Sequence, residues 1–235
     1  MIASITGIGW VQPGSMGSGR DHTIIDTENG SLPKLTSKML FGKTSLRFGR
    51  LDNYSKLGLA AIAFALKDAD RDVWKEPRPI GMIASTLFGC LDVDMKYLQT
   101  VLPQGGALAS PSLFAYTLPN VFIGEASIRF GLTGPGFVVN EPDQAGVEGL
   151  RMALHTIAMG DCSVMLAGIT DSGRPESFPY SRDAIPGALF FVLEKGPAGK
   201  TPIYGNLHMN NKGSIFFREK ALQDLRALMQ MCLNA

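Results

Sequence analysis

The feature that most constrains the fold of this chain is an alternation of short apolar runs with segments of helical periodicity. Runs of strand length occur at 2–11, 80–87, 137–139, 163–169 and 188–193, and 203–209 would add a sixth strand at a sheet edge. Helical spacing of apolar residues occurs at 51–70, 91–102, 119–130, 143–159 and 220–233. This alternation favours an α/β layered fold with a largely parallel central sheet. We predict one domain over 1–235, with 12–45 as its longest irregular segment.

Composition excludes several classes of function. The chain has 45% hydrophobic and 18% charged residues and a formal net charge of +1, without the excess of positive charge typical of nucleic-acid or anionic-membrane binders. No apolar stretch approaches the roughly 20 residues of a membrane span. The three cysteines are widely spaced and form no CxxC pair, so neither a metal site nor a cofactor is expected. A reducing, cytoplasmic location is predicted.

A strand-to-helix turn lies near the middle of the chain, in the sequence GPGFVVNEPDQAGVEGL at 134–150. The apolar run is followed by a polar turn, and the helical pattern begins at Asp143. Backbone N–H groups at a helix N-terminus favour negative charge, and enzymes often place a nucleophile there. Glu141 and Asp143 could form an acid/base pair. We favour a structural interpretation, in which Asp143 is the N-cap of the helix and Glu141 is solvated.

Other motifs have no clear chemistry. Gly7-Ile8-Gly9 follows a strand, but Gln12 replaces the third glycine of a dinucleotide-binding turn and Pro13 follows it. The histidines at 22, 155 and 208 are scattered over three segments and pair with no predicted nucleophile.

Five blocks of sequence are together more specific than any of these motifs. They are ITGIGWVQPG, RLDNYSKLGLAAIAFALKDA, SPSLFAYTLPNVFIGEASIRFGLTGPGFVV, GDCSVMLAGITDS and RDAIPGALFFVLEK, and they span about 2–195. In this order the blocks resemble the N-terminal half of a β-ketoacyl synthase. The resemblance implies a single thiolase-like half with a mostly parallel, mixed five-stranded sheet flanked by helices. Residues 203–235 would then form a terminal edge strand and helix.

The resemblance also implies that the nucleophile is missing. The family has an acyl-accepting cysteine in this turn, and alignment of Gly134, Pro135 and Gly146 with the family glycines places Asp143 at that cysteine. A shift of one residue would place Gln144 there, as in chain-length-factor subunits. The family's second half, with its histidines and gating loop, has no counterpart in 1–235. We therefore expect no catalytic residue.

From the resemblance we expect a noncatalytic, chain-length-factor-like subunit of fatty-acid, polyketide or aryl-polyene-like biosynthesis. It would pair with a full-length β-ketoacyl synthase, or with itself, and meet acyl carrier protein only indirectly. The residues expected to face the partner or the acyl pocket are Phe114, Tyr116, Leu118, Val121, Phe122 and Glu125.

Two alternatives remain. One is a residual acyl-thioester enzyme, a malonyl-carrier decarboxylase or a hydrolase, that uses Asp143 or Glu141. The other is a homo-oligomeric module that binds acyl carrier protein or acyl-CoA, with Arg174, Tyr180 and Arg182 as phosphate contacts.

Overall fold

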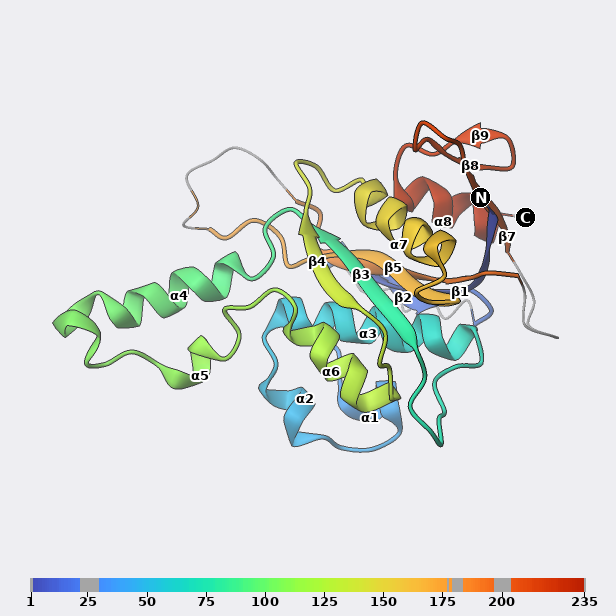
Figure 1. Ribbon diagram of the computed structural model, residues 1–235. Helices are drawn as coiled ribbons and strands as arrows, with labels where there is room; N and C mark the ends of the chain where they lie inside the picture. Colours follow the sequence, from blue (N-terminus) through green and yellow to red (C-terminus); the bar gives the residue numbers. More distant parts are fainter. Residues whose placement is uncertain (1, 22–29, 177, 179–183, 197–203, 235) are drawn as a thin grey trace.

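The computed structural model describes residues 2–21, 30–176, 178, 184–196 and 204–234, which form one nine-stranded sheet with helices on both faces (Figure 1). The strands are β1 (Ile2–Gln12), β2 (Ser15–Ser18), β3 (Ile80–Thr86), β4 (Gly136–Asn140), β5 (Val164–Asp171), β6 (Gly187–Glu194), β7 (Gly205–Met209), β8 (Ile215–Phe217) and β9 (Lys220–Ala221). The helices are α1 (Ser37–Phe41), α2 (Leu46–Arg50), α3 (Asn53–Asp68), α4 (Leu91–Val101), η2 (Pro103–Gly106), α5 (Pro111–Phe114), α6 (Val121–Phe130), α7 (Val147–Met159) and α8 (Leu225–Leu233).

The centre of the sheet has the order β4-β3-β5-β6-β1. β3 pairs in parallel with both β4 and β5, whereas β6 is antiparallel to β5 and to β1. Four of these five strands therefore run in one direction and β6 runs in the other. This confirms the predicted α/β fold with a mostly parallel, mixed five-stranded sheet.

Four short strands extend this five-stranded core, and three of them, β2, β8 and β9, were not predicted. β2 pairs with residues 9–12 of β1, and β7 pairs with residues 2–5 along the same strand. β8 and β9 continue the sheet outward from β7. The sixth strand predicted at 203–209 is present as β7, but it does not lie at the sheet edge, because β7 lies between β1 and β8. Residues 12–45, predicted to be irregular, contain β2 and α1.

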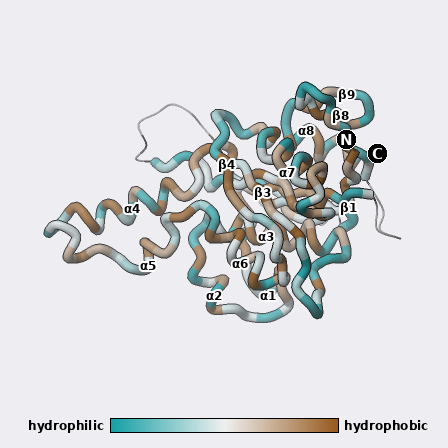
Figure 2. The backbone as a smooth tube through the Cα atoms, in the orientation of Figure 1, coloured by the Kyte–Doolittle hydropathy of each residue, from teal (hydrophilic) through white to brown (hydrophobic). Residues whose placement is uncertain are grey.

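The two faces of the sheet have separate hydrophobic cores because successive strand residues point to opposite sides. In β6, Phe190 and Val192 belong to the core beneath α3 and α6, whereas Phe191 and Leu193 belong to the core beneath α7 and α8. Figure 2 shows hydrophobic residues along the central strands and hydrophilic residues in the β8–β9 region. No helix of the described residues has the length and apolarity needed to cross a membrane.

Helix boundaries follow capping chemistry. The Asp52 side chain accepts hydrogen bonds from the backbone amides of Tyr54 and Ser55, and α3 therefore begins at Asn53. Gly131 ends α6 in the left-handed region, with φ 63°, as a C-cap glycine should. Two predicted starts are wrong. The helix predicted from 143 begins at Val147, and the helix predicted from 220 begins at Leu225 after the Asp224 cap.

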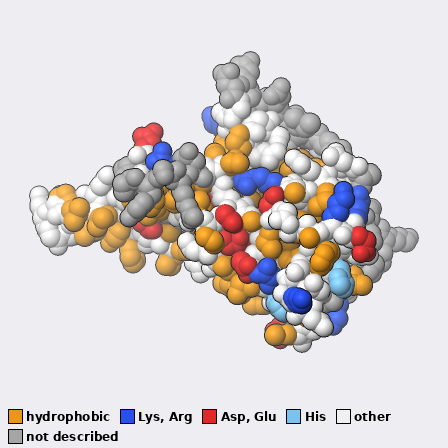
Figure 3. All heavy atoms as spheres, turned by 90° about the horizontal axis from the view of Figure 1, so that it is seen from above, with side chains coloured by type: hydrophobic (Ala, Val, Ile, Leu, Met, Phe, Trp, Pro, Cys, Tyr) orange, Lys and Arg blue, Asp and Glu red, His pale blue; other side chains and the backbone are white. Residues whose placement is uncertain are grey.

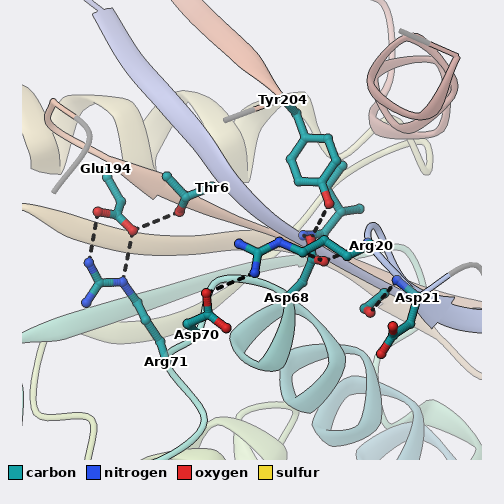
Figure 4. A network of polar contacts seen from close by, with 10 residues as sticks. Thr6, Arg20, Asp21, Asp68, Asp70, Arg71, Glu194 and Tyr204 are labelled. Atoms are coloured by element: carbon teal, nitrogen blue, oxygen red, sulfur yellow. Dashed lines mark hydrogen bonds and ion pairs between the residues drawn. The ribbon is translucent and has the colours of Figure 1, made fainter. Parts of the chain in front are cut away.

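Buried carboxylates tie segments from both ends of the chain together (Figure 4). Asp68, at the end of α3, accepts hydrogen bonds from the Ile8 amide at 2.8 Å, the Arg20 amide at 2.7 Å and the Tyr204 hydroxyl at 2.7 Å. Burial raises the pKa of Asp68, although these bonds oppose the shift. Glu194 accepts two bonds of 2.9 Å from the Arg71 guanidinium and a third from the hydroxyl of Thr6.

Candidate functional site

The candidate site is the turn formed by residues 141–146, between β4 and α7. It lies at the carboxyl ends of the parallel strands β3, β4 and β5. Ligands of open α/β sheets bind beyond the carboxyl ends of the strands, where the connecting segments leave room between them. The geometry of this turn therefore decides what chemistry the fold can support.

Glu141 is a buried hydrogen-bond acceptor in the turn and not a solvated residue, as we had expected. Its side chain is 4% exposed. Its carboxylate accepts hydrogen bonds from the amides of Gly146 and Gly149, both at 3.0 Å, and from the hydroxyl of Ser85. Glu141 thus satisfies backbone donors at the N-terminus of α7, the task that the sequence had suggested for Asp143.

Asp143 does not cap the helix. It is exposed, and its carboxylate accepts a hydrogen bond from the amide of Ala145 at 3.1 Å, the pattern of a local Asx turn. α7 begins four residues later, after Gly146, which has φ 74°. A β-carbon at Gly146 would lie 2.3 Å from Ile169 and 2.6 Å from Leu225, so the chain turns into α7 at a position that only glycine fills without strain.

Gln144 is held at both ends of its amide group. Its nitrogen donates to the Asp171 carboxylate at 2.9 Å and to the carbonyl of Ile185 at 3.2 Å, while its oxygen accepts from the Ile185 amide at 2.7 Å. The side chain therefore joins the turn to the end of β5 and to the segment before β6. It is a structural cross-link with little freedom to move.

Asp171 is the residue of this site that sequence reasoning missed. It is 1% exposed and accepts hydrogen bonds from the hydroxyl of Thr86, the amides of Leu87 and Phe88, and the side chain of Gln144. It thereby fixes the segment between β3 and α4. The available signal was its position: Asp171 ends an apolar strand that was predicted to lie in the same parallel sheet as the 137–139 strand.

None of the three cysteines of the chain lies in the turn, and all three are buried as free thiols. Burial raises the pKa of Cys90 to about 12, with the nearby Asp94 carboxylate adding to the shift. Burial also raises the pKa of Cys232 to about 12 and raises that of Cys162. At neutral pH these groups are thiols, whereas a thiolate is the reactive species in acyl transfer.

A cleft of about 480 Å³ opens beside the candidate site. Its walls come from the start of α3, from α4 and from residues 172–176, which directly follow Asp171. Arg174, one of the predicted phosphate contacts, lines this cleft and donates to the carbonyl of Phe178. Tyr180 and Arg182, the other two, lie outside the described residues, as does His22. Among the residues described, no group of three or more metal-ligating side chains occurs.

The predicted substrate or interface residues fall into two groups. Phe114 and Leu118 are each 61% exposed, on or just after an arm formed by α4, η2 and α5 that projects from the body of the molecule (Figure 1). The others lie against the body. Tyr116 and Val121 are partly buried on the core beneath α6, Phe122 is fully buried in it, and Glu125 pairs with Arg47.

Comparisons with known proteins agree with this fold. Residues 22–178 match the family described as "Beta-ketoacyl synthase, N-terminal domain". The putative polyketide beta-ketoacyl synthase 1 of Streptomyces halstedii is 26% identical over 196 residues, which cover 72% of this chain and 46% of that protein. The chain thus spans less than half the length of this curated relative.

Two solved structures share the fold. The ketosynthase (ApeO) in complex with its chain length factor (ApeC) from Xenorhabdus doucetiae matches with a TM-score of 0.63 and 20% identity, over 85% of this chain and 81% of that chain. The ishigamide ketosynthase/chain length factor matches with a TM-score of 0.65 and 18% identity, over 88% and 66% of the two chains. Because the family match covers about two thirds of the sequence, this chain belongs to the β-ketoacyl synthase family through its N-terminal domain.

Proposed function

We propose that this chain is a noncatalytic β-ketoacyl-synthase-like subunit that pairs with a full-length synthase and shapes its acyl pocket. The pathway would be of the polyketide or fatty-acid type. One observation carries the proposal: the turn at the carboxyl ends of the parallel strands has the sequence Glu-Pro-Asp-Gln-Ala-Gly, without a thiol, and its side chains are engaged in structural bonds. A carboxylate attacks a thioester far more weakly than a thiolate does.

The anchoring of Gln144 supports this role further. Its amide is bonded on one side to the buried Asp171 and on the other to the backbone of Ile185. A side chain held in this way stabilises the turn by linking it to two other segments of the chain. It supplies no nucleophile. Two solved structures with the same fold, the ApeO–ApeC complex and the ishigamide ketosynthase/chain length factor, contain a ketosynthase together with a chain length factor, which agrees with a paired arrangement.

The projecting arm supplies a surface for such a partner. Leu98, Leu102, Leu108, Phe114 and Leu118 are all more than half exposed. Figure 3 shows hydrophobic side chains gathered along the arm. The rings of Tyr97 and Phe114, 5.5 Å apart, join its two limbs. An exposed apolar patch of this kind usually marks an interface.

Co-purification with a full-length β-ketoacyl synthase from the same organism tests the proposal. We expect a stable complex, and loss of this subunit should change the length of the product. Replacing Phe114 and Leu118 together by Asp should weaken the complex by about tenfold or more, since buried aromatic and aliphatic anchors dominate such interfaces. Leu46→Asp is the matched control, because Leu46 is 79% exposed on α2, away from the arm.

The proposal fails if the two chains do not associate and product length is unchanged without this subunit. It also fails if the isolated, unmodified chain condenses or decarboxylates malonyl-carrier protein above the rate without protein.

A further inference from the structure

A small pocket lies in the helical layer on the face of the sheet opposite α7, and it shares no residue with the 141–146 turn. It encloses about 270 Å³ among α1, α2, α3 and α6. Phe41, Phe48, Leu59 and Ile128 form its apolar walls, and Arg47 and Arg129 contribute guanidinium groups. Figure 1 shows α1, α2 and α6 together beneath the sheet.

Arg129 is the unusual group in this pocket. Its guanidinium carbon lies 3.5 Å from the centroid of the Phe41 ring, over the face of that ring. Its Nε atom is buried and has no hydrogen-bond partner among the described residues. Burial lowers the pKa of Arg129, and no nearby carboxylate offsets that effect within the described part of the chain. Arg129 therefore has no ion-pair partner among the described residues, and its terminal nitrogens are the donors that a ligand in the pocket could meet.

The other guanidinium of the pocket is already neutralised. Arg47 forms an ion pair with Glu125, with Nε 2.6 Å from a carboxylate oxygen. Within the described part of the chain, the pocket therefore offers one cation without an anionic partner, beside an aromatic pair in which Phe41 and Phe48 meet edge to face at 5.8 Å. A phosphate dianion would require a second available cation. A monoanion with an apolar body matches both the charge and the walls.

We propose that this pocket binds a small carboxylate ligand with an apolar body. The carboxylate would accept hydrogen bonds from the Arg129 guanidinium, and the hydrocarbon part would lie against Phe41, Phe48, Leu59 and Ile128. Binding would supply the anion that Arg129 lacks and would cover apolar surface at the same time. This site is separate from the proposed subunit function, so neither result decides the other.

Calorimetric titration with octanoate tests the site, with octanamide as the uncharged control. We expect saturable binding of octanoate with a Kd of about 1 mM or tighter and binding of octanamide at least about tenfold weaker. Trp74 provides a second readout, because its indole nitrogen donates to the carbonyl of Arg129 at 2.9 Å. Its fluorescence should change over the same concentration range.

Variants with opposite expected effects sharpen the test. Arg129→Gln should weaken octanoate binding by about tenfold or more, since a charge-assisted bond is lost. Arg50→Gln, which changes an exposed residue at the end of the adjacent α2, should leave octanoate binding unchanged.

Glu125→Gln should tighten octanoate binding, because it releases Arg47 as a second cation. Ile128→Asp, at a position 61% exposed, should weaken binding through charge repulsion without disturbing the core.

The proposal is overturned if octanoate and octanamide bind equally, if neither binds, or if Arg129→Gln and Arg50→Gln have the same effect. Far-UV circular dichroism of each variant, matched to the parent chain, ensures that a loss of binding reflects the pocket.

Discussion

At the scale of single residues, Glu141 and Asp143 exchange the roles that their positions in the sequence suggest. Glu141 accepts bonds from two amides at the start of α7 and from Ser85, whereas Asp143 makes one local bond at the surface. Glu141→Ala would leave these buried donors without an acceptor. We expect it to lower the free energy of unfolding by about 2–4 kcal/mol. Asp143→Ala, the matched control, should cost less than about 1 kcal/mol. Urea denaturation of both variants measures the difference, and equal costs would contradict this account.

Asp143→Cys tests whether the turn can regain chemistry. The new thiol would be exposed, so it should react with iodoacetamide in the folded protein. It should form no condensation product, because the described histidines are too distant to act as its base. His155 lies eight residues beyond the start of α7, about 12 Å along the helix. His208 lies on β7, three strand spacings from β5, about 14 Å. Product analysis with acyl- and malonyl-carrier protein measures the outcome, and condensation by this variant would contradict the statement that no base lies near the turn.

At the scale of elements, α7 begins and ends with glycines of positive φ in different surroundings. Gly146 has φ 74° and little space for a β-carbon, whereas Gly160 has φ 87° and no atom near that position. Gly160→Ala should cost about 1 kcal/mol through backbone strain alone. Gly146→Ala adds overlap with Ile169 and Leu225 and should cost about 2–4 kcal/mol. Thermal unfolding of both variants compares them, and a larger loss at Gly160 would disprove the packing argument.

The predicted positions of α7 and Glu141 show where sequence reasoning succeeds and fails. Apolar periodicity correctly located the helix and its end at residue 159, because that pattern records which face is buried. It could not locate the start, since residues 143–146 continue the pattern while their backbone forms a turn held by Glu141. The role of Glu141 depends on Ser85, which is 56 residues away in sequence. The hydrogen bonds that Asp171 accepts likewise depend on the pairing of β3 with β5, which the apolar periodicity of the sequence does not record.

At the scale of the whole molecule, the buried Asp68 makes stability depend on pH. Its folded-state pKa is raised above the ordinary value of 3.8, chiefly by burial. The contribution of this group is therefore fully present below pH 3.8 and is lost as the pH rises through the folded-state pKa. The free energy of unfolding of the parent chain, minus that of Asp68→Asn, should decrease as the pH rises from about 4 through the raised folded-state pKa. Denaturant titrations across this range measure the slope, and a difference that rises with pH would contradict the burial argument.

The three cysteines report on global unfolding. They lie before α4, before β5 and within α8, and all are buried. With the pKa of Cys90 and of Cys232 raised to about 12, a thiol-specific reagent at pH 8 should react with the native chain far more slowly than with the chain in urea. The absorbance of released thionitrobenzoate measures both rates. Rapid labelling of any cysteine in the native state would indicate local opening around that residue.

The pairing of β1 has a consequence for how the chain folds. β1 ends at residue 12, yet its neighbours β6 and β7 end at residues 194 and 209. At about 5–20 residues per second, ribosomal synthesis would leave β1 without β6 for about 10–40 s. During that time the unpaired N–H and C=O groups along its edges are open to pairing with other chains. The short β2, which pairs with residues 9–12 and is made immediately after β1, gives this strand its earliest partner and the nascent chain its first protection from aggregation.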